Sequence, residues 1–317
     1  MGVKTIKLEN RNPKIMYNLP EKVVYCTRCV ISNQRPRIVF DENGVCSACK
    51  FADHKNNVID WIKRENELKA LCDRNRSKDG SYDVIVPGSG GKDSNYVAHM
   101  LKEKYGMTPL IVTWAPHIYT DIGRRNLTAF IDSGFDNILV TPNGIIHRLM
   151  TKAAFLEMGD PFQPFIFGQY SAPFRVAIQY KIPLVFYGED GEVEYGGSMD
   201  KADRPSLGYE DFVLHRFSGV SPEYFAKYGI EQKDLDRYSL SKQELSQLSE
   251  LNVEQHFFSY YHKWIPQENF YYSVEHTGFD LNPERSEGTF TKYASLDDQL
   301  DGFHFYLAYI KFGHGRC

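Results

Sequence analysis

Apolar residues in the middle of the chain follow two patterns, short runs of strand length and longer stretches with helical spacing. The short runs are rich in Val, Ile, Leu and aromatic residues, and they predict strands at 82–86, 110–114, 137–141 and 183–187, with a further candidate strand at 254–261. Apolar residues three or four positions apart predict amphipathic helices between them. The predicted helices are 51–74, 94–105, 121–132, 144–158, 169–180, 241–251 and 296–312.

Strands that alternate with helices predict parallel βαβ units. The expected fold class is α/β, with a five-stranded, doubly wound parallel sheet covered by helices on both faces. Ligands of such sheets bind at the carboxyl ends of the strands. We therefore expect chemistry in the loops that follow Val86, Trp114, Thr141 and Tyr187.

Composition places the chain among globular proteins. Of its 317 residues, 42% are hydrophobic and 25% are charged, which excludes wholesale disorder. The net charge of −4 lacks the basic excess of proteins that bind nucleic-acid backbone, so we expect no nucleic-acid partner. No apolar run approaches the roughly 20 residues that span a bilayer, and no secretory signal is visible at the N-terminus. The expected location is the cytoplasm, where cysteines serve as metal ligands more often than as disulfides.

Four of the six cysteines form two Cys-x2-Cys pairs, Cys26 with Cys29 and Cys46 with Cys49, separated by sixteen residues. Two such pairs complete a tetrahedral shell of four thiolates, and the segment 37–45 between them predicts a short hairpin with Asn-Gly at its turn. The pattern predicts a structural zinc ribbon at the N-terminus. An iron–sulfur cluster and four reduced thiols remain alternatives.

The first predicted strand leads directly into Gly88-Ser-Gly-Gly-Lys-Asp-Ser94 and then into a helix. Glycines allow backbone N–H groups to surround an anion, and the start of the helix favours phosphate. The Walker loop requires Gly-Lys-Ser/Thr and the dinucleotide fingerprint requires a third glycine, and Asp93 breaks both patterns. The segment instead matches Ser-Gly-Gly-x-Asp-Ser, the phosphate (PP) loop of enzymes that split ATP between its α- and β-phosphates. An ordinary glycine-rich turn is the alternative interpretation.

The loop, the cysteine pairs and two further segments occur in a characteristic order. The further segments are Val112-Thr-Trp-Ala-Pro116 and Phe186-Tyr-Gly-Glu-Asp-Gly191. In this combination the chain resembles the N-acetyl sugar amidotransferase family of surface-polysaccharide biosynthesis, within the PP-loop ATP-pyrophosphatase superfamily, over nearly its whole length. The loop alone is specific only for the superfamily. Members of the family continue well past Lys-Phe-Gly-x-Gly-Arg, whereas this sequence stops at Cys317, so we expect its C-terminal region to be short.

The resemblance implies an AMP-forming C–N ligase. Such an enzyme uses ATP and Mg²⁺ to adenylate the acetamido oxygen of a nucleotide-linked N-acetyl sugar, and ammonia then replaces that oxygen to give an acetamidino sugar for lipopolysaccharide O-antigen or a related surface glycan. No cysteine pattern of a built-in glutaminase is visible. The resemblance implies that a separate glutaminase, with a cyclase-like barrel partner, supplies the ammonia.

The expected catalytic residues are Lys92, Asp93, Glu189 and Asp190. Asp93 is expected to hold magnesium, and the pair after the fourth strand either contacts a second magnesium ion, accepts a proton from ammonium, or is an ordinary pair of solvated acids in a turn. Residues expected to bind ATP are Gly88, Ser89, Gly90, Gly91, Lys92, Asp93, Ser94, Thr113, Trp114, His117 and Lys292.

The sequence therefore predicts four regions: an N-terminal segment with the ribbon (1–50), a linking helix (51–81), the PP-loop ATP-binding domain (82–190), and a mixed, helical region for substrate or partner (191–317). Two other functions remain open. A tRNA-thiolating enzyme shares the PP-loop and often a metal module, although the acidic net charge disfavours it. A non-catalytic scaffold would bind nucleotide through the loop and a partner through the ribbon.

Overall fold

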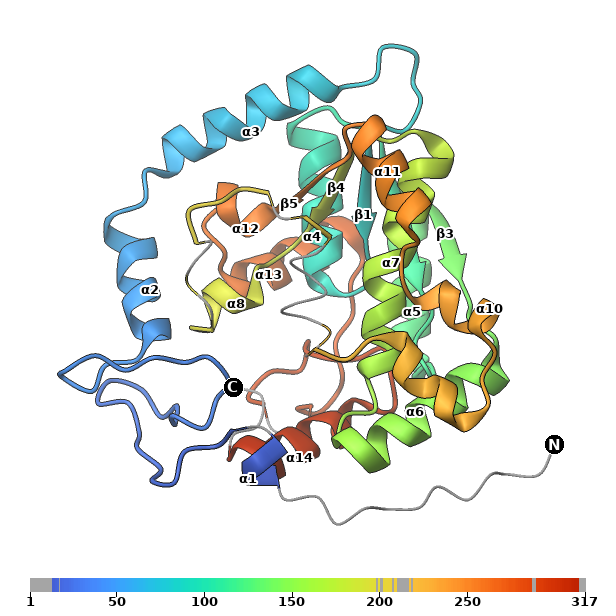
Figure 1. The fold of residues 1–317 in the computed structure, drawn as a ribbon. Coiled ribbons are helices and arrows are strands. Elements are labelled where there is room, and N and C mark those ends of the chain that lie inside the picture. Colours follow the sequence, from blue (N-terminus) through green and yellow to red (C-terminus); the bar gives the residue numbers. More distant parts are fainter. Residues whose placement is uncertain are drawn as a thin grey trace.

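The computed structural model describes residues 13–16, 18–197, 199, 202–206, 208–209, 217, 219–286 and 289–313. Its centre is a parallel five-stranded sheet with the strand order β3-β2-β1-β4-β5, which confirms the α/β fold class (Figure 1). The strands are β1 (Val84–Pro87), β2 (Pro109–Trp114), β3 (Asp136–Val140), β4 (Leu184–Tyr187) and β5 (Glu254–Phe257).

The strand order reverses beside β1. The chain passes from β1 to β2 and β3 on one side, and it then returns to place β4 and β5 on the other side. Ile85 pairs with Leu110 of β2 and with Val185 of β4, so β1 lies between two parallel neighbours. In open α/β sheets such a reversal leaves a crevice at the carboxyl ends of the strands. The loops after β1 and β4 therefore border the expected binding site.

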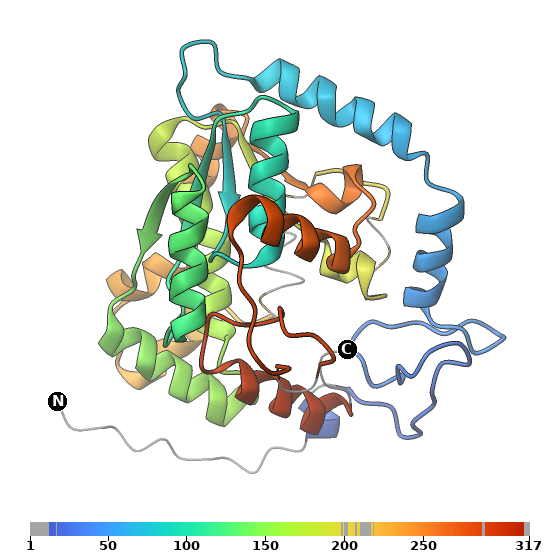
Figure 2. The same ribbon diagram turned by 180° about the vertical axis from the view of Figure 1, so that it is seen from behind.

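Helices cover both faces of the sheet (Figure 1 and Figure 2). One face packs on α6 and α7, and the other packs on α3, α4, α5 and α12. Burial on both faces explains why the central strands are apolar at nearly every position. The helices are α1 (Pro13–Met16), α2 (Ser47–Asn57), α3 (Trp61–Asn75), α4 (Lys92–His99), the π-helix η1 (Met100–Lys104), α5 (Asp121–Asp132), α6 (Gly144–Met158), α7 (Gln163–Tyr180), α8 (Gly191–Glu194), the 3₁₀ helix η2 (Pro222–Tyr228), α10 (Gln232–Leu235), the 3₁₀ helix η3 (Asp236–Tyr238), α11 (Lys242–Glu250), α12 (Phe258–Tyr261), α13 (Pro266–Thr277) and α14 (Asp301–Phe312).

Helices with clear local signals agree with the sequence. The bounds of α5 and α6 are those predicted, and Ser241 caps α11 in a capping box with Glu244. The predicted helix 51–74 is instead two helices, because Val58 ends α2 and the Asp60 carboxylate accepts a hydrogen bond from the N–H of Lys63 to start α3. The predicted boundary after residue 50 therefore falls inside α2.

The predicted helix 94–105 is α4 followed by the π-helix η1, and three other bounds lie four or more residues from the sequence predictions. The strand expected at 254–261 ends at Phe257, and α12 follows at once. Helix α7 begins at Gln163, six residues before its predicted start. Helix α14 begins at Asp301 and not at residue 296, because the Asp298 carboxylate holds the preceding segment against residues 117 and 118 in a non-helical conformation. Within the described ranges, no helix has both the length and the apolar character that crossing a bilayer requires.

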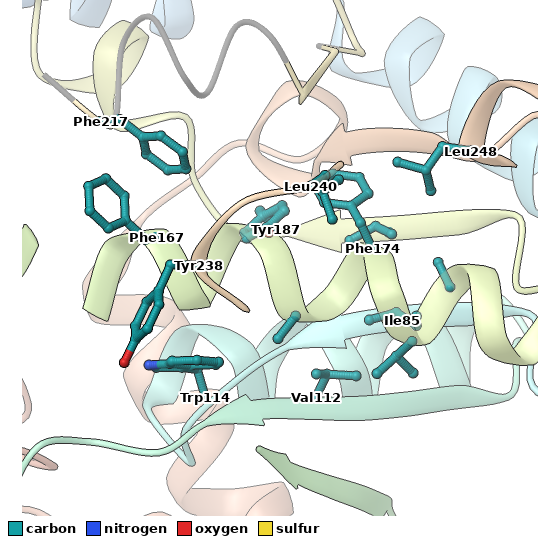
Figure 3. Packing of buried hydrophobic residues seen from close by; sticks show 14 of the residues in the cluster. Ile85, Val112, Trp114, Phe167, Phe174, Tyr187, Phe217, Tyr238, Leu240 and Leu248 are labelled. Atoms are coloured by element: carbon teal, nitrogen blue, oxygen red, sulfur yellow. The ribbon is translucent and has the colours of Figure 1, made fainter. Parts of the chain in front are cut away.

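The indole of Trp114 lies between the end of β2 and helix α7. Its ring centroid is 5.7 Å from that of Tyr238, and Figure 3 shows the two side chains side by side beyond Ile85 and Val112. A Cβ atom at Gly168 of α7 would lie 2.0 Å from the Cε2 atom of Trp114. Glycine at this position therefore allows α7 to approach the sheet closely enough to bury the indole.

Gly168→Ala is expected to lower the free energy of unfolding by about 1–3 kcal/mol, because the added methyl group overpacks the indole. Urea denaturation measures the change. Gly144→Ala is the matched control, since a Cβ atom at Gly144 meets no atom within 4 Å at the start of α6. Equal stability of the two variants would contradict the close contact.

Candidate functional site

A cavity of about 400 Å³ lies at the carboxyl ends of β1, β2 and β4, where the strand order reverses. Its walls come from the loop after β1, the end of β4, the first turns of α7, and the segment 295–301. The described residues that line it are Pro87, Gly88, Ser89, Gly91, Asp93, Ser94, Val112, Trp114, Phe162, Phe165, Gln169, Tyr170, Tyr187, Gly188, Glu189, Gly191, Ser295, Asp297, Asp298 and Asp301.

The loop after β1 is held in a tight turn by two glycines. Gly90 has a φ angle of +90°, and a Cβ atom there would lie 2.6 Å from the backbone nitrogen of Leu127 in α5. At Gly88, a Cβ atom would lie 2.6 Å from the Cβ of Ser94. Within the described structure, no group accepts a hydrogen bond from the N–H groups of the first turn of α4, residues 92–94. This turn can therefore bind an anion in the way the sequence predicts.

Lys92 and Asp93 form an ion pair at the start of α4. The Lys92 Nζ lies 2.6 Å from each carboxylate oxygen of Asp93, and the Lys92 residue is only 6% exposed. Helix α13 supports the pair, because the Ser273 hydroxyl donates to the Lys92 carbonyl over 2.7 Å and the Asn269 amide donates to Asp93 over 3.4 Å. Asp93 lines the cavity, whereas the Lys92 ammonium group lies behind it on Asp93. Their proposed catalytic roles stay predictions.

Thr113 and Trp114, expected beside adenosine, occupy different positions at the end of β2. The buried Thr113 hydroxyl donates to the Gly88 carbonyl over 2.5 Å and accepts a hydrogen bond from the Asn137 amide over 2.7 Å. It therefore holds the phosphate loop against β2. Trp114 lines the cavity, and its buried Nε1 has no hydrogen-bond partner among the described residues.

The two acids after β4 have different surroundings. Glu189 lines the cavity, and its carboxylate accepts hydrogen bonds from the Tyr195 hydroxyl over 2.7 Å and from the Trp264 indole over 3.0 Å. Asp190 caps α8 by accepting from the N–H of Glu192 over 3.0 Å. Glu189 is therefore placed to meet a ligand, and Asp190 is placed to shape the turn.

His117 is oriented by an acid that the sequence analysis did not find. Its Nδ1 lies 2.8 Å from the Asp298 carboxylate, which also accepts a hydrogen bond from the His117 backbone N–H over 2.6 Å. Burial of Asp298 opposes ionisation, yet the His117 side chain and backbone N–H groups lower the pKa of the carboxyl group. The paired side chains are only 5% and 3% exposed. Asp298 lines the cavity, and His117 lies behind it.

The Lys292 ammonium group is bound to a backbone carbonyl of its own segment. Its Nζ donates to the Pro283 carbonyl over 2.6 Å, and it is not among the described residues lining the cavity. Its predicted contact with pyrophosphate stays a prediction.

The charged side chains in the described lining of the cavity are all carboxylates. Five acids line it and no lysine, arginine or histidine does. Three of them, Asp297, Asp298 and Asp301, come from the segment before α14 and were missed because nothing in the local sequence links that segment to the loop after β1. Where phosphates meet carboxylates, a divalent cation can offset their repulsion. Asp93 and Glu189 could hold Mg²⁺ there.

The four cysteine sulfurs form the predicted cluster, with all ligand atoms within 4.8 Å of one another. The Cys26–Cys49 and Cys29–Cys46 sulfur distances are 4.0 and 3.7 Å. A tetrahedral zinc ion with 2.3 Å bonds separates its sulfurs by about 3.8 Å, so the spacing fits one such ion. A cluster of several irons would hold the sulfurs further apart.

Backbone N–H groups favour the thiolate form of Cys26, which is the form that binds metal. Burial opposes ionisation of Cys26, but hydrogen bonds from the N–H groups of Arg28 and Cys46 lower the pKa of its thiol to about 6. Between the two cysteine pairs, the predicted hairpin is a short turn. Gly44 has a φ angle of +74° there, and Phe40 forms an isolated antiparallel β-bridge with Cys46.

The ribbon and α2 contact the segment that follows β4. Arg37 pairs with Glu192 over 2.8 Å, and the Ser47 hydroxyl donates to the Gly196 carbonyl over 2.7 Å. Lys55 pairs with Glu194 over 2.6 Å, and burial raises the pKa of that glutamate although the lysine opposes the shift. The four-cysteine module therefore supports the turn that carries Glu189.

No family model matches this chain, and no curated protein matches it. Among solved structures, it is similar to the NH3-dependent NAD synthetase from Campylobacter jejuni, with 16% identity, 61% of this chain and 94% of that chain covered, and a TM-score of 0.34. It is also similar to the U34-tRNA thiolase NcsA from Methanococcus maripaludis with its [4Fe-4S] cluster, with 15% identity, 90% and 80% covered, and a TM-score of 0.32. For the NMN synthetase from Francisella tularensis the identity is 12%, the covered shares are 72% and 100%, and the TM-score is 0.32. With such low identities and TM-scores, the functional inference rests on the residues of the site.

The purified chain is expected to contain one zinc ion, and Cys46→Ser is expected to lose it, because three thiolates leave the tetrahedral shell open. Elemental analysis measures the metal, and thermal unfolding measures the accompanying loss of stability. Cys72→Ala is the control, since this buried cysteine lies in α3 outside the cluster. Iron together with visible absorption would contradict the zinc assignment.

Asp298→Asn is expected to lower the free energy of unfolding by about 1–3 kcal/mol at pH 7, because a neutral amide accepts hydrogen bonds more weakly. The folded pKa of Asp298 is below the unfolded value of about 3.9, so the carboxylate stabilises the fold above that pH and loses the effect as pH falls. The difference in the free energy of unfolding between variant and parent should therefore become smaller below about pH 4. Denaturation across pH measures it, with the exposed Glu284→Gln as control, and a constant difference would contradict the assignment.

Proposed function

We propose that the chain is an AMP-forming N-acetyl sugar amidotransferase that converts the acetamido group of a nucleotide-linked sugar into an acetamidino group. The observation that carries the ATP-dependent part is the cavity at the strand-order reversal. It places the Ser-Gly-Gly-x-Asp-Ser loop, with unpaired N–H groups at the start of α4, opposite a set of carboxylates. The sugar substrate and the place in lipopolysaccharide O-antigen biosynthesis come from the sequence resemblance.

The loop and the acids divide the binding of ATP between them. The backbone around Ser89 and Gly91 and the hydroxyl of Ser94 would bind phosphate oxygens at the start of α4. Mg²⁺ held by Asp93 would offset the charge that develops on the departing pyrophosphate. Trp114 and the aromatic residues of α7 would exclude water from the rest of the nucleotide.

The chemistry requires a better leaving group than an amide oxygen. Transfer of AMP to the acetamido oxygen releases pyrophosphate. Ammonia then attacks the carbon that bears this oxygen, and AMP departs with the oxygen. The carboxylates of the cavity would attract ammonium, and Glu189, which lines the cavity, would accept its surplus proton. We further propose that a separate glutaminase with a barrel-shaped partner supplies the ammonia in the cell.

Incubation with ATP, Mg²⁺, ammonium and nucleotide-linked N-acetyl sugars is expected to release AMP with at least one sugar of the panel. Mass spectrometry should then show one oxygen replaced by NH. EDTA should abolish the reaction because the cavity carboxylates repel phosphate without a cation. A parallel incubation with bulk tRNA tests thiolation chemistry, and AMP release with tRNA alone would reject the sugar substrate.

Variants of the two neighbouring acids, Glu189 and Asp190, distinguish a catalytic role from a structural role in the same assay. Glu189→Gln is expected to lower kcat at least about 100-fold, because it removes the proton acceptor. Asp190→Asn is the matched control, since asparagine caps a helix as well as aspartate. Equal losses in the two variants, with unchanged folding, would contradict the role of Glu189.

A further inference from the structure

A second cavity of about 640 Å³ adjoins the first at the carboxyl ends of β2 and β3. Its walls come from the loops after these strands, from one side of α6, and from the start of α14, which lies beside α6 in both views (Figure 1 and Figure 2). Its volume is within the range of about 300–1,000 Å³ that is typical of small-molecule sites. The described lining residues are Ala115, Pro116, His117, Ile118, Thr141, Pro142, Gly144, His147, Arg148, Thr151, Lys152, Phe155, Pro161, Leu300 and Phe303.

The two cavities have opposite charge. The described lining of the second cavity contains Arg148 and Lys152 and no aspartate or glutamate. These cations lie one turn apart on α6, both are exposed, and neither forms an ion pair with any residue that the structure describes. Gly144, the first residue of the same helix, adds the positive end of the helix dipole. The cavity therefore favours an anion, and its described lining, unlike that of the first cavity, contains cationic side chains.

Two buried ring nitrogens in this lining have no partner within the described structure. They are the Nε2 atoms of His117 and His147, whose rings stack with centroids 4.7 Å apart. His147 is 5% exposed, as is the side chain of His117. Burial lowers the pKa of His147 to about 3, so its ring is neutral at physiological pH. Buried polar atoms are almost always paired, so each ring has one hydrogen-bonding nitrogen that a water or a bound polar group at the cavity wall can satisfy.

Aromatic side chains form the outer wall of the cavity. Phe155 of α6 and Phe303 of α14 meet edge to face, with centroids 6.2 Å apart, and they are 37% and 54% exposed. Exposed rings beside cationic side chains can stack on a flat base while the cations bind its phosphates. A nucleoside diphosphate has both groups.

We propose that this second cavity binds the nucleoside diphosphate of the acceptor substrate, with the base against Phe155 and Phe303 and the diphosphate at Arg148 and Lys152. The group attached to the diphosphate would then point toward the first cavity, because the paired His117 and Asp298 form the wall between the two cavities. The identity of the attached group rests on the proposed amidotransferase function, whereas the binding site itself does not.

Isothermal titration of the full chain with uridine diphosphate tests the site without turnover. Arg148→Ala combined with Lys152→Ala is expected to weaken binding at least tenfold, about 1.4 kcal/mol, while the affinity for ATP stays unchanged. Lys63→Ala combined with Lys69→Ala removes the same charge from the exposed side of α3 and is the matched control. Absence of binding, equal effects of the two double variants, or competition between uridine diphosphate and ATP would each overturn the proposal.

Pyrophosphate distinguishes a nucleoside site from a simple anion site. Phe303→Ala is expected to weaken binding of uridine diphosphate several-fold and to leave pyrophosphate binding unchanged. With the phosphate loop saturated by ATP, pyrophosphate binding as tight as that of uridine diphosphate, with no effect of Phe303→Ala, would overturn the nucleoside part.

Turnover measurements distinguish a failure of this binding site from a failure of the proposed amidotransferase function. Unchanged KM for the sugar nucleotide in the Arg148→Ala and Lys152→Ala double variant would reject the site while the amidotransferase function stands. Uridine diphosphate binding that depends on these residues, in a protein that forms no AMP with any sugar, would support the site and reject the function.

Discussion

Two parallel neighbours hold β1 in the centre of the sheet, and the geometry of the site depends on that position. Hydrogen bonding to β2 and β4 directs the loops after β1 and β4 into one crevice. The Thr113 hydroxyl then ties the Gly88 carbonyl to β2, and Gly90 lies against the backbone of α5, where no larger residue fits. Strand pairing, one hydroxyl and one close backbone contact together aim the first turn of α4 at the cavity.

Charge is distributed unevenly around this crevice. The segment 295–301 supplies carboxylates to the first cavity, while α6 supplies cations to the second. The pair of His117 and Asp298 lies between them, with one member lining each cavity. Carboxylates favour metal ions and ammonium, and cationic side chains favour phosphate, because charges attract the opposite sign most strongly where water is limited. Such a division would keep an anionic acceptor and metal-bound ATP apart until their reacting groups meet.

The four-cysteine module does not contribute to the described lining of the first cavity but contacts the segment that follows β4. Its contacts through Arg37, Ser47 and Lys55 all reach the segment 192–196, directly after the acids that follow β4. Lys55 also donates to the carbonyl of Trp264, whose indole donates to Glu189. A closed shell of four thiolates has no open position for chemistry, so its physical contribution is to stabilise this turn.

Local signals in the sequence were sufficient for most elements and for part of the site. Apolar runs, helical periodicity, the Ser241 cap and the spacing of the cysteines each depend on near neighbours, and the structure confirms the strands, α5, α6 and the sulfur cluster. The glycine-rich loop was recognisable for the same reason. Asp298, Arg148 and the second cavity could not be recognised from the sequence, because they depend on contacts between segments far apart in the chain. His117 and Asp298, for example, are 181 residues apart. The sequence by itself determined which segments form strands, helices and metal ligands, and only the tertiary structure decided which charged side chains face one another across the crevice.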